Sequence, residues 1–213
     1  MIACRENNMS DTIQKKLMIL NDSHKKIIDE WFSMLQQRQC KFNGINYNGR
    51  KLRAELRRVS LSELIILQDG YTILANKLLN NDSKLAQTDI HYHALQILVN
   101  VAVFAELNND KAPFAAQLSE KVKGGERNYL SKLRFERLLN SETPEEFCQR
   151  LIRAVKLRGE KGVNLTSLAD GIFLWMQEWY AREHNWPANT NPFKRFSTRW
   201  AMDYFSTKNN TKE

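Results

Sequence analysis

The sequence predicts an all-α protein made of two packed helical bundles, with about nine or ten helices in total. Apolar residues recur three and four positions apart along most of the chain, which is the spacing of one buried helix face. The 213 residues include only 8 Gly and 4 Pro, so turns are few and elements are long. Hydrophobic residues make up 42% of the chain, enough to build a core without disulfide or metal cross-links.

The first half of the chain is predicted to contain an N-terminal arm, residues 1–21, and a helical bundle, residues 22–110. The arm is polar and lacks a clear period, so we expect it to be loose or to form a short frayed helix. Ile28, Trp31 and Leu35 mark the apolar face of the first helix. Residues 41–49 hold two glycines and three asparagines and are expected to form a loop. Helical patterns follow at 50–58, 60–79 and 88–107.

A second bundle is predicted for residues 111–213, after a polar break at 108–111. Its helix starts are signalled by Pro113, by the run Thr143-Pro144-Glu145-Glu146 and by Asn191-Pro192, because a polar cap followed by a first-turn proline favours helix initiation. The last helix is expected to begin there and to bury its aromatic residues in the core, rather than to stack them on bases.

The charge of the chain indicates a polyanionic partner. Lys and Arg number 32 against 24 Asp and Glu, a net charge of +8, which suits nucleic acid or an anionic membrane surface. Solubility alone is the simpler alternative. Cys4, Cys40 and Cys148 lie far apart and form no CxxC pair, which favours a reducing cytoplasm. No signal-peptide or membrane-spanning run is present, so we expect a cytoplasmic protein without a membrane partner.

The strongest candidate site is the short basic helix at residues 50–58. Its nucleic-acid-binding candidates are Arg50, Arg53, Arg57 and Arg58. Three of these arginines fall within about 60° of one another on a helix, while Leu52 and Leu56 point the opposite way, toward a core. Arginine can bind phosphate through two parallel N–H bonds. We therefore interpret this helix as a backbone-binding face, with a plain solvated face as the alternative.

Two further basic clusters are candidate nucleic-acid-binding surfaces, one between residues 121 and 161 and one on the last helix. Their candidates are Lys132, Arg134, Arg150, Arg153, Lys156, Lys194, Arg195 and Arg199. For any single one of these residues, an ordinary charged helix surface is an equal alternative.

Signals of catalysis are weak. His91 and His93 form an HxH pattern, but positions i and i+2 of a helix face different ways. The carboxylates Asp170, Glu178 and Asp203 are isolated in the sequence, whereas a two-metal nuclease needs a cluster of them. No phosphate-binding glycine loop or HExxH motif occurs. We expect a non-enzyme with no metal and no cofactor.

Four segments resemble the CasB-type small subunit of the type I-E CRISPR Cascade complex. Arg53-Ala-Glu-Leu-Arg57-Arg58 is similar to the RAxLRR signature of that family, and residues 132–139 are similar to its RFxxLL segment. Residues 151–175 follow its LR…LLxDLxxW layout, and residues 199–205 resemble its terminal RWAxxFY-like motif. The resemblance covers residues 24–206. The longer arm, the Asn-rich 41–49 segment and Asn164, where an Asp is common, depart from the pattern.

The resemblance implies an antiviral defence protein with a two-bundle helical fold. It implies two copies side by side in a crRNA-guided complex, with basic faces on the target-strand and displaced-strand backbones stabilising the R-loop. Base pairing would read the sequence, so the protein needs only charge and shape. Arg57 and Arg58 carry over as backbone contacts, followed by Arg153 and Arg199. The alternatives are a helical DNA-binding regulator and an uncharacterised helical nuclease.

Overall fold

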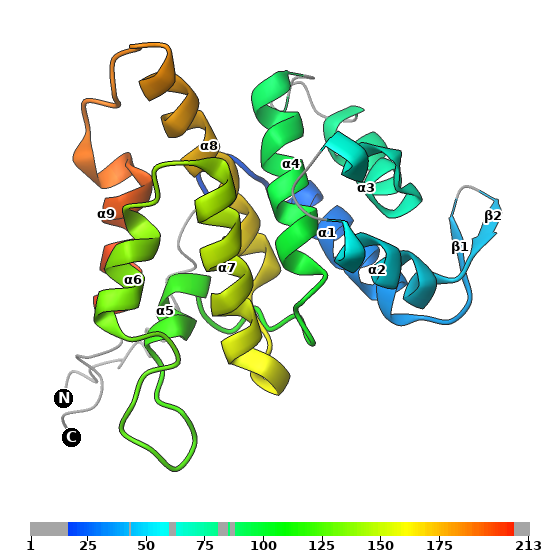
Figure 1. The fold of residues 1–213 in the computed structure, drawn as a ribbon, viewed down its shortest axis with the longest axis horizontal. Coiled ribbons are helices and arrows are strands. Elements are labelled where there is room, and N and C mark those ends of the chain that lie inside the picture. Colours follow the sequence, from blue (N-terminus) through cyan, green and yellow to red (C-terminus); the bar gives the residue numbers. More distant parts are fainter. Residues whose placement is uncertain (1–16, 43, 60–62, 81–84, 86–87, 207–213) are drawn as a thin grey trace, which may run out of the picture.

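The structure is a computed structural model that describes residues 17–42, 44–59, 63–80, 85 and 88–206. It is predominantly helical, which confirms the predicted all-α class (Figure 1). None of the described helices is long and apolar enough to cross a membrane. The α-helices of the described residues are α1 (Asp22–Gln36), α2 (Gly49–Arg58), α3 (Asp69–Asn80), α4 (Asp89–Ala102), α5 (Phe114–Ser119), α6 (Lys132–Leu139), α7 (Pro144–Arg158), α8 (Leu165–Glu183) and α9 (Phe196–Ser206). Short 3₁₀ turns are η1 (Glu63–Leu67), η2 (Gly159–Lys161) and η3 (Pro192–Lys194).

The predicted loop at residues 41–49 contains a short antiparallel hairpin, so this part of the prediction was wrong. Strands β1 (Cys40–Phe42) and β2 (Ile45–Tyr47) pair with Cys40 opposite Tyr47. Gly44 has a φ of +83°, a left-handed conformation that glycine adopts without strain. An Asn-Gly pair between two short β-prone runs is a strong hairpin signal. Gly44 therefore marks a turn between strands, while Asn48 and Gly49 belong to the start of α2.

Helix α4 joins the two predicted bundles into one continuous core. It packs chiefly against α8 and α7, and also against α3 and α2 (Figure 1). Its side chains are buried around most of the helix, including Leu95, Leu98 and Val99. A helix that is apolar on nearly all sides must have neighbours on nearly all sides. Although the sequence places α4 in the first bundle, most of its packing is with helices of the second.

The core of the second half is built from stacked aromatic rings. Phe147 stacks on Trp175 with ring centres 4.2 Å apart, and Phe196 lies edge-on to Phe147 at 5.5 Å. Trp200 packs so closely on α8 that a Cβ at Gly171 would lie 2.5 Å from its ring. Phe196 and Trp200 are both buried, which confirms that they pack in the core and are not available to stack on bases.

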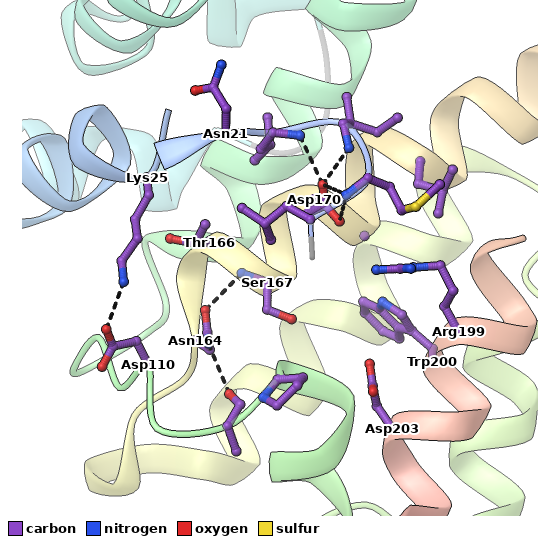
Figure 2. A pocket seen from close by; sticks show the side chains of 18 of the residues that line it. Asn21, Lys25, Asp110, Asn164, Thr166, Ser167, Asp170, Arg199, Trp200 and Asp203 are labelled. Carbon is purple, nitrogen blue, oxygen red and sulfur yellow. Dashed lines mark hydrogen bonds and ion pairs between the residues drawn. The ribbon is translucent and has the colours of Figure 1, made fainter. Parts of the chain in front are cut away.

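The end of the predicted arm is anchored rather than loose. The Asp170 carboxylate accepts the backbone N–H groups of Met18 at 3.0 Å, Ile19 at 2.8 Å and Leu20 at 3.0 Å (Figure 2). Asn21 then caps α1 in a reciprocal arrangement with His24. The expectation of a loose arm is therefore wrong for residues 17–20, and residues 1–16 lie outside the described part of the chain.

Candidate nucleic-acid interface

The predicted basic helix is α2, and it is held on the core as expected. The Asn48 side chain caps it by accepting the backbone N–H of Lys51 at 3.1 Å. Leu52 and Leu56 are buried, so the arginines are displayed on the other side. Gly49 sits where a Cβ would lie 1.9 Å from the Met34 carbonyl oxygen, so only glycine allows α2 to start this close to α1. The cap, the buried leucines and the close approach at Gly49 therefore fix the position of α2 on the core.

Two of the α2 arginines bind the end of α4, which the sequence did not predict. The last carbonyls of a helix have no partners within it and carry partial negative charge. The Val103 carbonyl, just past α4, accepts the Nε–H of Arg53 at 2.9 Å and the Nε–H of Arg57 at 2.8 Å. Arg53 also donates to the Gln36 side chain at 2.6 Å and to the Ala105 carbonyl. Arg53 therefore has a structural role in joining α1, α2 and α4.

Arg53 and Arg57 lie close together, but they differ in burial and in how much of each guanidinium is hydrogen-bonded. Burial, and then repulsion from Arg57, lower the pKa of the Arg53 guanidinium from its ordinary value. Its three nitrogens nevertheless each donate a hydrogen bond to an oxygen, and these bonds stabilise the charged form at its partly buried position. Arg57 differs because it is exposed and uses only its Nε–H in a hydrogen bond with a described residue. Arg57 can therefore still offer its outer nitrogens to a phosphate.

Phe104 brings the first basic cluster into contact with the second. The Arg57 Cζ atom lies 5.5 Å from the centre of the Phe104 ring, and the Lys156 Nζ atom of α7 lies 4.1 Å from the same centre. Cations are attracted to the negative faces of aromatic rings at such distances. Arg57 and Lys156 are nearly 100 residues apart in the sequence, yet the two clusters form one surface at the end of α4.

Of the other α2 and α7 candidates, some are exposed without a hydrogen bond or ion pair to a described residue, and the others bind groups of the protein itself. Arg58 and Arg153 are exposed and make no hydrogen bond or ion pair with another described residue. Arg153 precedes Lys156 by nearly one helical turn, so it extends the same surface. Arg50 is exposed and donates to the Gln36 carbonyl at 3.1 Å. Arg150 binds the Arg137 carbonyl, the Ser141 hydroxyl and Glu146, and so ties α7 to the end of α6.

The remaining candidates lie away from this surface, on α6 and around the start of α9. Lys132 is 3.6 Å from Glu136, and Arg134 is exposed. Lys194 lies in η3 and Arg195 in the link to α9, where its Nε–H donates to the Asn189 carbonyl at 2.9 Å. The prediction that both lie on the last helix was wrong, because that helix begins at Phe196.

Arg199 is half-buried beside a cavity of about 580 Å³ between the anchored N-terminal segment, α8 and α9 (Figure 2). Asp170, Trp200 and Asp203 line the same cavity. The Asp170 carboxylate is satisfied by backbone N–H groups, so this residue serves to dock the segment before α1. Arg199 therefore belongs to a different environment from Arg57 and Lys156.

Arg158 is a buried cation with a structural role that sequence reasoning missed. Its side chain is about 1% exposed, and its Nη1 atom donates to Glu120 Oε2 at 2.7 Å and to the Gln117 carbonyl at 2.8 Å. The Nε–H donates to the Gly162 carbonyl, and the guanidinium lies 4.5 Å from the Tyr129 ring centre. A cation in the last turn of α7 was visible in the sequence, but nothing there showed that it points inward.

Two of the groups weighed as catalytic candidates, His91 and Glu178, have structural partners. His91 is buried, with its two ring nitrogens 3.2 Å from the Thr88 hydroxyl and 3.4 Å from the Gln177 amide. Glu178 accepts the backbone N–H of Phe196 at 2.7 Å, and burial raises the pKa of this carboxyl. Over the described ranges, no group of three or more His, Cys, Asp or Glu residues could hold a metal ion.

Comparison with known proteins gives one match. The family model described as CRISPR-associated protein Cse2 matches residues 52–205, which is most of the chain. The matched span runs from α2 to α9 and includes Arg57, Phe104 and Lys156. No curated protein and no solved structure matches.

Proposed function

The chain belongs to the Cse2 family of CRISPR-associated proteins, the CasB-type small subunits of type I-E Cascade, and we propose that it grips DNA backbone there without catalysis. In this proposal the protein works in the cytoplasm beside the other Cascade subunits, the crRNA and a second copy of itself. It holds the strands of a target duplex that the guide has opened. Membership of the family shows that the chain is a Cascade subunit. That it binds the DNA backbone is our proposal.

The observation that carries the proposal is the cationic surface around Phe104. Arg57 and Lys156 meet at this ring, and Arg58 and Arg153 extend the positive charge along α2 and α7. Exposed cations concentrated in one place repel each other unless an anion lies opposite, and phosphates are the anions that a nucleic acid supplies. We name this group of four residues the Phe104 surface.

The chemistry of the Phe104 surface suits backbone rather than bases. Reading a base edge requires a side chain held at a fixed angle in a groove, usually Asn, Gln or Arg at the start of an exposed helix. On the Phe104 surface the four polar groups are all cations, and they project from the end of α2 and the second half of α7. In a guide-directed complex, base pairing with the guide reads the sequence, so the protein needs only to hold the backbone of the strands.

A salt titration tests the proposal. Wild-type protein and the Arg153→Ala and Lys156→Ala variants are titrated with fluorescent oligonucleotides at several salt concentrations. Each lost phosphate contact should reduce the log–log salt slope by about 0.7 on single strands or about 0.9 on duplex. Lys26→Ala is the matched control, because Lys26 is an exposed lysine of α1 whose side chain keeps 79% of its accessible surface.

The outcomes separate the candidate functions. Equal affinity for unrelated sequences and smaller slopes in both variants support the backbone grip. Affinity that follows base sequence at constant salt would contradict it and favour a helical regulator. Cleavage of the oligonucleotides in the presence of Mg²⁺ or Mn²⁺, lost on a single substitution, would favour a nuclease.

A further inference from the structure

We infer that Phe104 is a positioning residue that makes Arg57 and Lys156 act as one paired binding site for neighbouring phosphates of a single strand. The inference rests on the proposed function, and it adds an explanation of how the protein holds the two cations in place. The pair would combine one cation from each half of the molecule, so that a bound backbone crosses the end of α4.

The geometry places both cations within reach of one backbone. Their charged atoms lie 5.5 Å and 4.1 Å from the same ring centre, so they are less than about 10 Å apart. Phosphates of one strand advance by about 3.4 Å per nucleotide along a helix axis, so phosphates one or two steps apart on the same strand fall within such a separation. Like charges this close repel each other, and the negative faces of the Phe104 ring offset part of that repulsion.

The position of Phe104 is itself fixed. It follows Val103, whose carbonyl accepts the Nε–H groups of Arg53 and Arg57, and its own backbone N–H donates to the Val101 carbonyl at 3.1 Å. The ring is half-buried, so one part packs on the core while the rest remains at the surface. Arg57 is thus held at two points, by the Val103 carbonyl and by the ring. Lys156 is exposed and makes no hydrogen bond or ion pair with a described residue, so the ring is the group that holds its charged end.

An aromatic ring is required for this role, whereas an aliphatic side chain would satisfy packing alone. Leucine at position 104 would fill much of the same space but has no negative face for a cation. Tryptophan has the strongest cation–π attraction of the aromatic side chains. A role in positioning the cations should therefore be lost with leucine and kept with tryptophan, whereas a role in packing alone should tolerate leucine.

The test compares Phe104→Leu and Phe104→Trp with wild-type protein in oligonucleotide binding at low salt. Loss of two cation–π contacts should weaken binding by roughly three- to tenfold in Phe104→Leu. Phe104→Trp should keep wild-type affinity. Thermal melting reports folding independently, and variants are compared only at temperatures where each is fully folded.

A double-mutant cycle gives the readout that packing would not change. With Phe104 present, Arg57→Ala and Lys156→Ala should show coupled losses of affinity, because removing either cation breaks the pair. In the Phe104→Leu background the same two losses should become additive. Additive losses with Phe104 present, or equal binding by Phe104→Leu and wild-type protein, would overturn the inference. If wild-type protein bound no oligonucleotide at all, the proposed function would fail instead.

Discussion

The anchor of the N-terminal segment gives a direct prediction for Asp170. Its carboxylate accepts three successive backbone N–H groups, from Met18, Ile19 and Leu20, over distances of 2.8 to 3.0 Å. A hydrogen bond to a charged group contributes about 1.5–3 kcal/mol, against about 0.5–1.5 for a neutral one. Asp170→Asn removes the charge but retains one acceptor oxygen, so we expect a loss of about 3–4.5 kcal/mol over the three bonds.

The loss should appear first as local release of the segment. Residues 17–20 directly precede α1, and Leu20 is buried in the core, so release of the segment also exposes this apolar side chain. Hydrogen exchange followed by mass spectrometry should show faster exchange at the amides of Met18, Ile19 and Leu20 in Asp170→Asn. Asp203→Asn is the control, since Asp203 lines the same cavity and accepts none of these bonds. Unchanged exchange at these three amides would refute the anchor.

Three further predictions concern the buried Arg158 and Cys148 and the half-buried Glu178. Arg158→Met should destabilise the protein in urea unfolding by about 3–5 kcal/mol, because Glu120 and two carbonyls lose their partner; a loss below about 1 kcal/mol would contradict this. Burial raises the pKa of the Cys148 thiol to about 12, so iodoacetamide should label Cys40 but leave Cys148 unmodified in the folded protein at mildly alkaline pH, as peptide mass spectrometry would show. Burial raises the pKa of Glu178 in the folded state, so this group lowers stability as the pH rises through that pKa. Glu178→Gln should therefore raise the melting temperature at neutral pH, with a smaller gain at acidic pH, and an equal gain at both would refute the reasoning.

The helices could be predicted from the sequence because apolar spacing and capping residues are local signals. The start of α7 follows from its polar cap at Thr143, and the buried face of α2 follows from Leu52 and Leu56. The hairpin at residues 40–47 differs from the predicted loop because Gly and Asn are common in both, and the Asn-Gly pair is the one signal that separates them. Lys194 was assigned to a helix because proline at Pro192 was taken as a helix start, when it opens a short 3₁₀ turn instead.

The arrangement of the basic residues could be predicted only in part, because it depends on tertiary contacts. Periodicity shows which face of α2 carries its cations, but it does not show that α4 ends beneath that face. For this reason the structural roles of Arg53 and Arg150 were hidden, and so was the meeting of Arg57 with Lys156 at Phe104. The inward orientation of Arg158 depends on Glu120, which is 38 residues away.

The division of roles among the arginines decides which substitutions test DNA binding cleanly. Replacing Arg57 removes a hydrogen bond to the Val103 carbonyl as well as a surface charge, so a loss of function would have two explanations. Arg153 and Lys156 are exposed and make no described hydrogen bond or ion pair, so reversing their charge should leave folding nearly unchanged. They are therefore the better pair for a test in the assembled complex.

The most direct test of the account measures opening of a matched target duplex by Cascade containing the Arg153→Glu/Lys156→Glu subunit. Permanganate probing of unpaired thymines reports the opening, with mutant and wild-type complexes compared at equal subunit occupancy. Reversing both charges changes the local charge by about −4 and replaces attraction to phosphate with repulsion. We predict a sharp fall in opening, no fall for Lys26→Glu, and unchanged helical content by circular dichroism. Full opening by the double variant would show that the Phe104 surface does not hold DNA.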